Sequence, residues 1–193
     1  MRLHGDMTTG TDIHPDYLVG TWKLDPYHSE LSFSVRHLMI SKVKGTFGTF
    51  DVTIVTAEDP RESTVEATID VASVNTGVEP RDNHLRSSDF FLVEEHPTMT
   101  FRSTGFDGDA TTGEFTVTGD LTLRGVTRPV TLTGEFGGIM TDGQGNTKAG
   151  ATVTGKINRL DFGVNWNSAL EAGGVTLGDE VTVTADIQVA LQK

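Results

Sequence analysis

From Gly20 onward, apolar and polar residues alternate one by one, and this period of two dominates the chain. Between residues 64 and 71, for example, Val65, Ala67 and Ile69 alternate with threonine and acidic residues. The same alternation returns in residues 115–123, 130–136, 151–157 and 181–189. Because successive side chains of a strand point to opposite faces, each segment is typical of an antiparallel strand with one wet and one dry face.

Clusters of glycine, aspartate and asparagine at 107–114, 123–129 and 141–146 separate the strands and predict turns. The alternation changes phase once, because Val43 and Phe47 are odd-numbered whereas Phe50 is even-numbered. A bulge or bend near Gly48 would explain this change.

Helix is expected only in short pieces. Residues 81–92 can hold two turns, with Asp82 or Asn83 as the N-cap, and residues 167–173 can hold one or two more. No linker or repeat interrupts the strands, so we expect a single domain over residues 20–193, preceded by a flexible tail over residues 1–19.

At least eight strands must each hide one apolar face, which two packed sheets or a closed barrel would achieve. Closure removes exposed strand edges, and eight strands enclose a space that side chains or one small ligand can fill. Periodicity alone leaves open whether such a barrel is filled or hollow.

Composition narrows the function. The 193 residues carry a net charge of -12, so a nucleic acid is not an expected partner and an anionic membrane surface is disfavoured. No cysteine is present, which excludes disulfides and thiolate chemistry. The first residues lack a signal-peptide apolar core, and no apolar run reaches the roughly 20 residues of a membrane helix, so we expect a cytoplasmic protein that is not integral to a membrane.

Motifs for catalysis or metal binding are missing from the sequence. The histidines in "LDPYHSELSFSVRHL", His28 and His37, lie nine positions apart, an odd number, and would point to opposite faces of one uninterrupted strand. No H-E-x-x-H, nucleophile elbow or phosphate loop occurs. We therefore expect no catalytic residue, no metal and no cofactor.

Residues 76–91 concentrate charge immediately before Phe90 and Phe91, through Arg81, Asp82, His84, Arg86 and Asp89. They could form a surface loop joined by its own ion pairs. They could equally form a polar rim over an apolar cavity, where Arg81 and His84 would hold an anionic or carbonyl head group.

The string "TGVEPRDNHLRSSDFF", together with "LDPYHSELSFSVRHLMISKVKGTF", "GDLTLRGVTRPVTL", "INRLDFGV" and "LGDEVTVTADI", resembles the YceI-like family of polyisoprenoid-binding, lipocalin-like proteins. The resemblance covers nearly the whole domain from Trp22. It implies an all-β, eight-stranded antiparallel lipocalin-like barrel with one or two short helices and a deep apolar pocket. It also implies a homodimer that binds or carries an isoprenoid quinone, a polyprenyl phosphate or another fatty lipid. Met39 stands where this family often has glycine.

The predicted ligand-binding residues combine the apolar alternation with polar side chains at the mouth: Leu31, Phe33, Val35, His37, Phe47, Phe50, Ile69, Arg81, His84, Met99, Phe101, Phe115, Val117, Leu132, Val153 and Ile157. Two alternatives stay open. One is an enzyme acting on a lipophilic substrate through His37, His84 or Arg81, and the other is a filled barrel serving as a stress or interaction protein.

Overall fold

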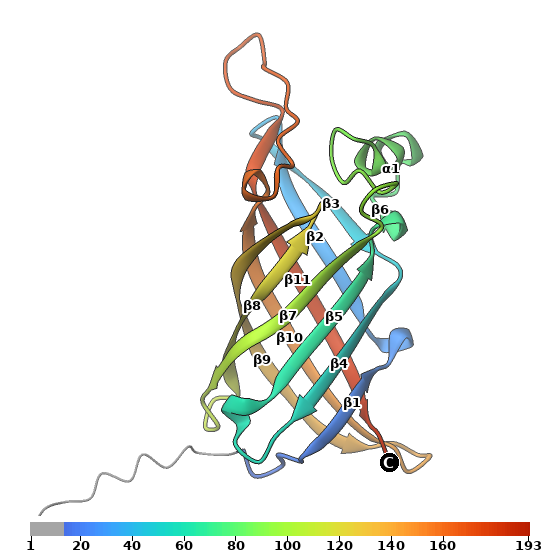
Figure 1. The fold of residues 1–193 in the computed structure, drawn as a ribbon, viewed down its shortest axis with the longest axis vertical. Helices are drawn as coiled ribbons and strands as arrows, with labels where there is room; N and C mark the ends of the chain where they lie inside the picture. The colour runs from blue at the N-terminus through green and yellow to red at the C-terminus, as the bar shows by residue number, and fades with distance from the viewer. Residues whose placement is uncertain (1–13) are drawn as a thin grey trace, which may run out of the picture.

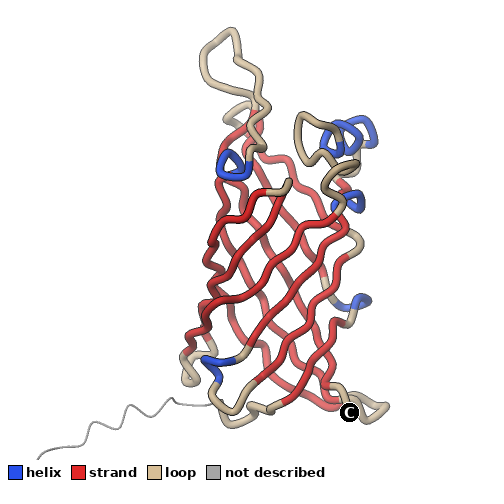
Figure 2. The backbone as a smooth tube through the Cα atoms, in the orientation of Figure 1, coloured by secondary structure: helices blue, strands red, loops and turns tan. Residues whose placement is uncertain are grey.

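A computed structural model describes residues 14–193 as an antiparallel β-barrel with helical and irregular segments gathered mainly at its ends (Figures 1 and 2). The strands are β1 (Gly20–Leu24), β2 (Glu30–His37), β3 (Ser41–Phe47), β4 (Phe50–Thr56), β5 (Thr64–Asp70), β6 (Val74–Asn75), β7 (Thr98–Gly108), β8 (Glu114–Leu123), β9 (Val126–Thr141), β10 (Thr147–Asn158) and β11 (Leu177–Leu191). One α-helix is present in this range, α1 (Glu79–Arg86). The 3-10 turns are η1 (Pro26–His28), η2 (Pro60–Glu62), η3 (Val71–Ser73) and η4 (Arg159–Phe162).

These strands occupy eight positions around the barrel, which confirms the predicted fold. Strands β1 and β2 pair with successive parts of β11, while β4 and β3 pair with β1 and β2 on the other side. Strands β5 and β6 lie beyond them, beside β4 and β3 respectively. Strands β1 and β2 therefore share one position in the barrel, as do β3 and β4, and β5 and β6. The pairings of β11 with β1 and β2 close the ring. Closure leaves no long edge strand to attract another chain.

The phase change near Gly48 is a bend, as predicted. Strand β3 ends at Phe47 and β4 begins at Phe50. Ser73 holds the two residues between them, since its carbonyl oxygen accepts from the Gly48 N–H at 3.1 Å and its Oγ accepts from the Thr49 N–H at 3.1 Å. The bend compensates for the change from odd-numbered to even-numbered apolar residues, so apolar side chains of β3 and of β4 both face the barrel interior.

The helix predictions are partly wrong. Helix α1 begins at Glu79, with Pro80 in its first turn and Val78 as N-cap, so neither Asp82 nor Asn83 caps it. Proline is favoured in the first turn because it needs no hydrogen-bond partner for an N–H. Residues 167–173 form turns rather than a helix, and an isolated bridge joins Ala169 to Val175.

The two ends of the barrel differ. Helix α1, the β2–β3 turn and the segment before β11 lie at one end, at the top of Figure 1, whereas the β9–β10 turn and the C-terminus lie at the other. Of the predicted tail, residues 1–13 lie outside the described part of the chain. His14 packs edge-on against Phe136 with ring centroids 5.0 Å apart, and the Tyr17 hydroxyl lies 3.0 Å from Ser63 Oγ, so both contact the end opposite α1. Within residues 14–193, no helix has the length and apolar character needed to cross a membrane.

Candidate ligand-binding site

Two adjoining cavities occupy the barrel. The larger, about 400 Å³, is called the barrel cavity, and the smaller, about 270 Å³, lies beside α1 and is called the helix-end cavity. A ring of side chains borders both cavities and is called the waist: Phe33, Phe47, Met99, Leu121, Ile157 and Val183. The cavities therefore adjoin along the barrel and share an apolar border.

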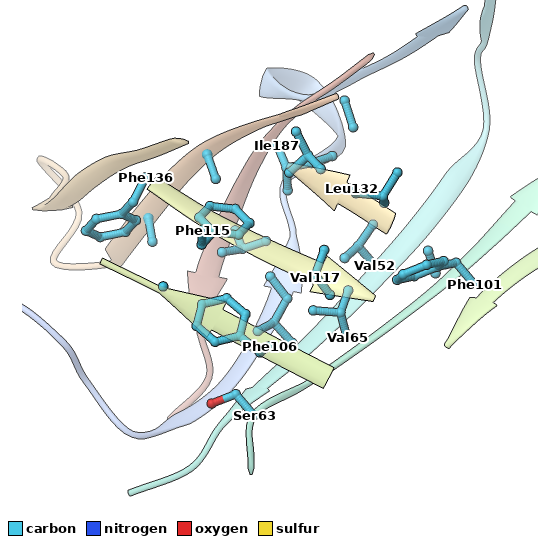
Figure 3. A pocket seen from close by; sticks show the side chains of 18 of the residues that line it. Val52, Ser63, Val65, Phe101, Phe106, Phe115, Val117, Leu132, Phe136 and Ile187 are labelled. Atoms are coloured by element: carbon cyan, nitrogen blue, oxygen red, sulfur yellow. The ribbon is translucent and has the colours of Figure 1, made fainter. Parts of the chain in front are cut away.

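The barrel cavity has apolar walls supplied by nearly every strand. Figure 3 shows Val52, Val65, Phe115 and Leu132 around it, each from a different strand. Phe106 and Phe115 stack with their ring centroids 5.5 Å apart. Such walls favour an apolar guest, because burying apolar surface is worth roughly 25 cal/mol per Å² removed from water.

Glycines in the wall help to keep this space open. Gly134 pairs directly with Phe115, and a β-carbon at Gly134 would overlap the Phe115 ring. Gly45 accommodates Phe33 in the same manner, and Gly119 accommodates Phe101. Each ring lies over a backbone without a side chain, so large aromatic residues cover the wall without filling the space enclosed by it.

Charged residues occupy the two ends unequally. The outer part of the barrel cavity has Arg61 and the carboxylates of Asp107, Asp109 and Glu114 in its lining. The helix-end cavity is lined by His37, Arg81, His84 and Arg159, and among the described residues no aspartate or glutamate lines it. The helix-end cavity is therefore the better environment for an anionic or carbonyl group.

Both interpretations of residues 76–91 hold in part. The segment is joined internally, because Asp82 is buried and its Oδ1 accepts from the Thr76 N–H at 2.8 Å and from Thr76 Oγ1 at 2.6 Å. Arg81 donates from Nε to Thr76 Oγ1 at 2.7 Å, and His84 Nε2 lies 2.7 Å from an Asp89 carboxylate oxygen. Arg81 and His84 nevertheless line the helix-end cavity, so the segment is also the rim of an apolar cavity.

Arg159 is a structural centre of the helix-end cavity that the sequence pattern did not single out. Its side chain is 6% exposed, and it donates from Nε to the Gly178 carbonyl and from Nη1 to the carbonyls of Val164 and Trp166, at 2.8–2.9 Å. Burial lowers the pKa of this guanidinium, and Asp179, 3.9 Å from Nη2, opposes that effect. Arg159 thereby holds the loop that carries Trp166 against the rings of His84 and Phe90.

Every predicted ligand-binding residue lines one cavity or the other. Val35, His37, Arg81 and His84 line the helix-end cavity, and the remaining predicted residues line the barrel cavity, some of them at the waist. Contact of these residues with a ligand stays a prediction. The sequence pattern missed further lining residues: Trp22, Leu85, Phe90, Phe91, Phe106, Phe136, Trp166, Leu177 and Ile187. Phe136 and Ile187 lie within the alternating segments, so the period-two signal could have found them.

His28 and His37 have different surroundings, since His28 ends η1 and His37 ends β2. His37 lines the helix-end cavity, whereas His28 Nδ1 lies 3.0 Å from Asp25 Oδ2. The same carboxylate oxygen accepts from Lys148 Nζ at 2.9 Å, and this contact is the main reason that the pKa of Asp25 falls to about 2. Within residues 14–193, no group of three or more histidine and acidic side chains is arranged to hold a metal ion.

The sequence of this chain is similar to those of known proteins. A family model described as a YceI-like domain matches residues 22–189. A UPF0312 protein of Staphylococcus aureus is 41% identical over 172 residues, which cover 88% of this chain and 96% of the relative.

Solved structures share the fold. The YCEI protein of Campylobacter jejuni is 28% identical, with a TM-score of 0.70 and full coverage of both chains. Burkholderia cenocepacia BcnA is 21% identical, with a TM-score of 0.73 and coverage of 86% of this chain and 98% of that one. A polyisoprenoid binding domain from Saccharophagus degradans is 19% identical, with a TM-score of 0.63 and coverage of 91% of this chain and 100% of that one.

Proposed function

Because this chain belongs to the YceI-like family, we propose that it binds the apolar tail of a polyisoprenoid lipid inside its barrel and sequesters or carries that lipid without covalent chemistry. The Saccharophagus degradans neighbour, whose fold this chain shares, is described as a polyisoprenoid binding domain. The observation that carries the proposal is the pair of adjoining cavities with apolar walls.

The shape suits a long, kinked chain better than a compact ligand. The cavities of about 400 and 270 Å³ share the waist as their border, so one guest that fills both must extend past that ring of side chains. Aromatic rings and the flexible thioether of Met99 lie at the waist, and such side chains adapt to an irregular apolar surface. These open cavities contradict the alternative of a filled barrel.

Charge supports one orientation of the guest. Arg81, His37 and His84 surround the helix-end cavity, while carboxylates lie at the far end of the barrel cavity. A quinone carbonyl or a phosphate accepts hydrogen bonds and is favoured near cationic donors. We therefore place the head group in the helix-end cavity and the tail through the waist into the barrel cavity.

Trp166 supplies the test, because its indole lines the helix-end cavity, where the head group would lie. Titration with an isoprenoid quinone should quench its fluorescence with saturation, and a polyprenyl phosphate should compete. In Arg81→Gln, the affinity for the phosphate should fall about tenfold, since a charged hydrogen bond is worth roughly 1.5–3 kcal/mol. Arg102→Gln is the matched control, because Arg102 is 78% exposed and pairs with Glu66 outside the cavities. Absence of saturable binding by either lipid class would contradict the proposal.

A further inference from the structure

The turn between β2 and β3 exposes consecutive apolar side chains. Leu38, Met39 and Ile40 are 38%, 62% and 83% exposed. The backbone holds them outward, since Leu38 N–H donates to the Thr176 carbonyl at 2.8 Å and Ile40 N–H donates to the His37 carbonyl at 3.2 Å. Leu38 and Met39 also have positive φ angles, 52° and 63°, a conformation that costs an ordinary side chain free energy. We call residues 38–40 the apolar tip.

Positive charge lies on the hairpin that carries the apolar tip. Arg36, Lys42 and Lys44 are exposed on the strands that lead to it, and Arg36 pairs directly with Lys42 in the register. No acidic residue occurs between Glu30 and Asp51, in a chain whose net charge is -12. Among the described residues, none of these cations has a carboxylate oxygen within 4.0 Å. The β2–β3 hairpin is therefore positively charged, whereas Asp179 and Glu180, opposite Arg36 on the adjoining β11, pair with Arg159 and Lys156.

The apolar tip also borders the helix-end cavity. His37, immediately before it, lines this cavity, as do Thr176 and Leu177 on the segment that receives the Leu38 hydrogen bond. On the same segment, Val175 is 42% exposed and Gly174 lies against the Met39 side chain. A surface bound by the tip would consequently lie beside the mouth of the cavity.

We propose that the apolar tip docks on an anionic lipid membrane, with Leu38, Met39 and Ile40 among the lipid chains and Arg36, Lys42 and Lys44 against the phosphates. Apolar side chains flanked by basic ones are the combination that binds the interface of an anionic bilayer. Net charge alone predicts repulsion from such a surface, but screening confines each interaction to roughly 8 Å at physiological salt, so local charge decides docking.

At the opposite end of the barrel, within residues 14–193, exposed apolar side chains occur together with carboxylates. Met140, beside the β9–β10 turn, is 76% exposed, but Asp142 follows in that turn and Asp109 lies in the β7–β8 turn. A second copy of this chain is a poorer occupant of the tip, because a symmetric contact would bring the same cations together. Three side chains also offer much less area than the roughly 800 Å² per partner of a stable interface.

Docking would let a lipid pass between the membrane and the barrel. Only this role in lipid exchange rests on the proposed function; the docking itself does not. The test is cosedimentation of the full chain with vesicles of phosphatidylcholine alone and of equal parts phosphatidylcholine and phosphatidylglycerol. Binding should require phosphatidylglycerol and weaken as sodium chloride is added. Lys42→Gln and Lys44→Gln should each weaken it about fivefold, the equivalent of one cation at a charged surface.

A second variant removes the apolar contribution. In Met39→Asn/Ile40→Thr the tip becomes polar, and asparagine accepts the positive φ at position 39, so the fold should be kept. Vesicle binding should fall at least tenfold. Met140→Gln changes a methionine at the other end that is even more exposed than Met39, and this variant should bind as the parent does. Equal binding by parent and tip variant, or no binding by the parent, would overturn the proposal.

Two readouts separate the remaining outcomes. If the tip variant converts a dimer to a monomer in sedimentation velocity without changing vesicle binding, the tip contacts a second copy and membrane docking is overturned. The Trp166 titration with a quinone should be the same in parent and tip variant. Quinone binding without vesicle binding removes docking alone, whereas vesicle binding without quinone binding removes the lipid-carrying function alone.

Discussion

The ring of Phe115 occupies the space that a β-carbon on Gly134, its partner across β8 and β9, would fill. Gly134→Ala should force the ring toward the barrel cavity. Overpacking of this kind costs about 1–3 kcal/mol, and the smaller cavity should also lower the affinity for a long isoprenoid. Urea unfolding and the quinone titration measure the two effects. Gly143→Ala is the control, because nothing lies within 4 Å of a β-carbon there; equal effects at both positions would show that Phe115 is not displaced.

Val183 lies at the waist and lines both cavities. Val183→Phe should narrow the passage, so a quinone with a long tail should lose affinity at least tenfold. A quinone with a single isoprene unit, which does not cross the waist, should lose much less. Titration of both quinones checks this. Thr182→Val, on the same strand and outside both linings, should leave both affinities unchanged. An equal loss for both quinones would indicate general misfolding rather than a blocked passage.

Asp25 connects the start of the barrel to β10 through Lys148. Its pKa falls from 3.8 to about 2 on folding, chiefly because Lys148 donates to its carboxylate. A depressed pKa contributes stability above the unfolded value that disappears as the pH falls through the folded value. Asp25→Asn should therefore lose about 2 kcal/mol near neutral pH, and this loss should shrink as the pH falls toward about 2 and vanish well below it, as urea unfolding across this range would show.

A matched exposed pair provides the control for Asp25. Asp59 pairs with Arg61, and its pKa is also lowered by that arginine, but the pair is exposed. Solvent screens such pairs, so Asp59→Asn should change stability much less. If Asp25→Asn shows no dependence on pH between neutrality and acid, the contact with Lys148 does not stabilise the fold.

Arg159 donates to three backbone carbonyls around the helix-end cavity, two on the loop before β11 and one on β11 itself. Arg159→Met should cost about 3 kcal/mol or more, because each buried acceptor left without a donor costs roughly 1–3 kcal/mol. Arg159→Lys should recover only part of this loss, since an ammonium cannot reproduce the planar fork of donors. Thermal unfolding measures stability, and the Trp166 emission should shift to longer wavelength as its loop loosens. Full stability of Arg159→Lys would show that the three hydrogen bonds of the guanidinium do not hold this loop.

Much of the fold follows from local pattern. The alternation around Ile69 defines a strand and its inward face, and the phase change between Phe47 and Phe50 marks a bend. Both could be predicted because each depends only on residues that are close together in the sequence. The predicted start of α1 is wrong because aspartate is a favoured N-cap residue, and the local sequence around Asp82 does not show that its side chain bonds elsewhere. Only the folded structure shows its carboxylate bonded to Thr76 instead.

The hollow interior and the polar lining of the helix-end cavity could be predicted less fully than the strands. Whether Phe115 fills the barrel depends on its register against Gly134, and register is a property of two strands. Trp166 and Arg159 line the helix-end cavity through irregular loops, where no period exists to indicate a face. The sequence also gives the net charge at once, but only the hairpin brings Arg36 and Lys42 together beside the apolar tip.

The barrel is expected to hold an isoprenoid tail. Native mass spectrometry of the full chain after mixing with an isoprenoid quinone, followed by solvent extraction of the desalted protein, tests it most directly. The account predicts a complex with one quinone per chain that survives desalting, and a marked loss of that complex in Val183→Phe. A protein that emerges without quinone, or a complex retained equally by Val183→Phe, would contradict it.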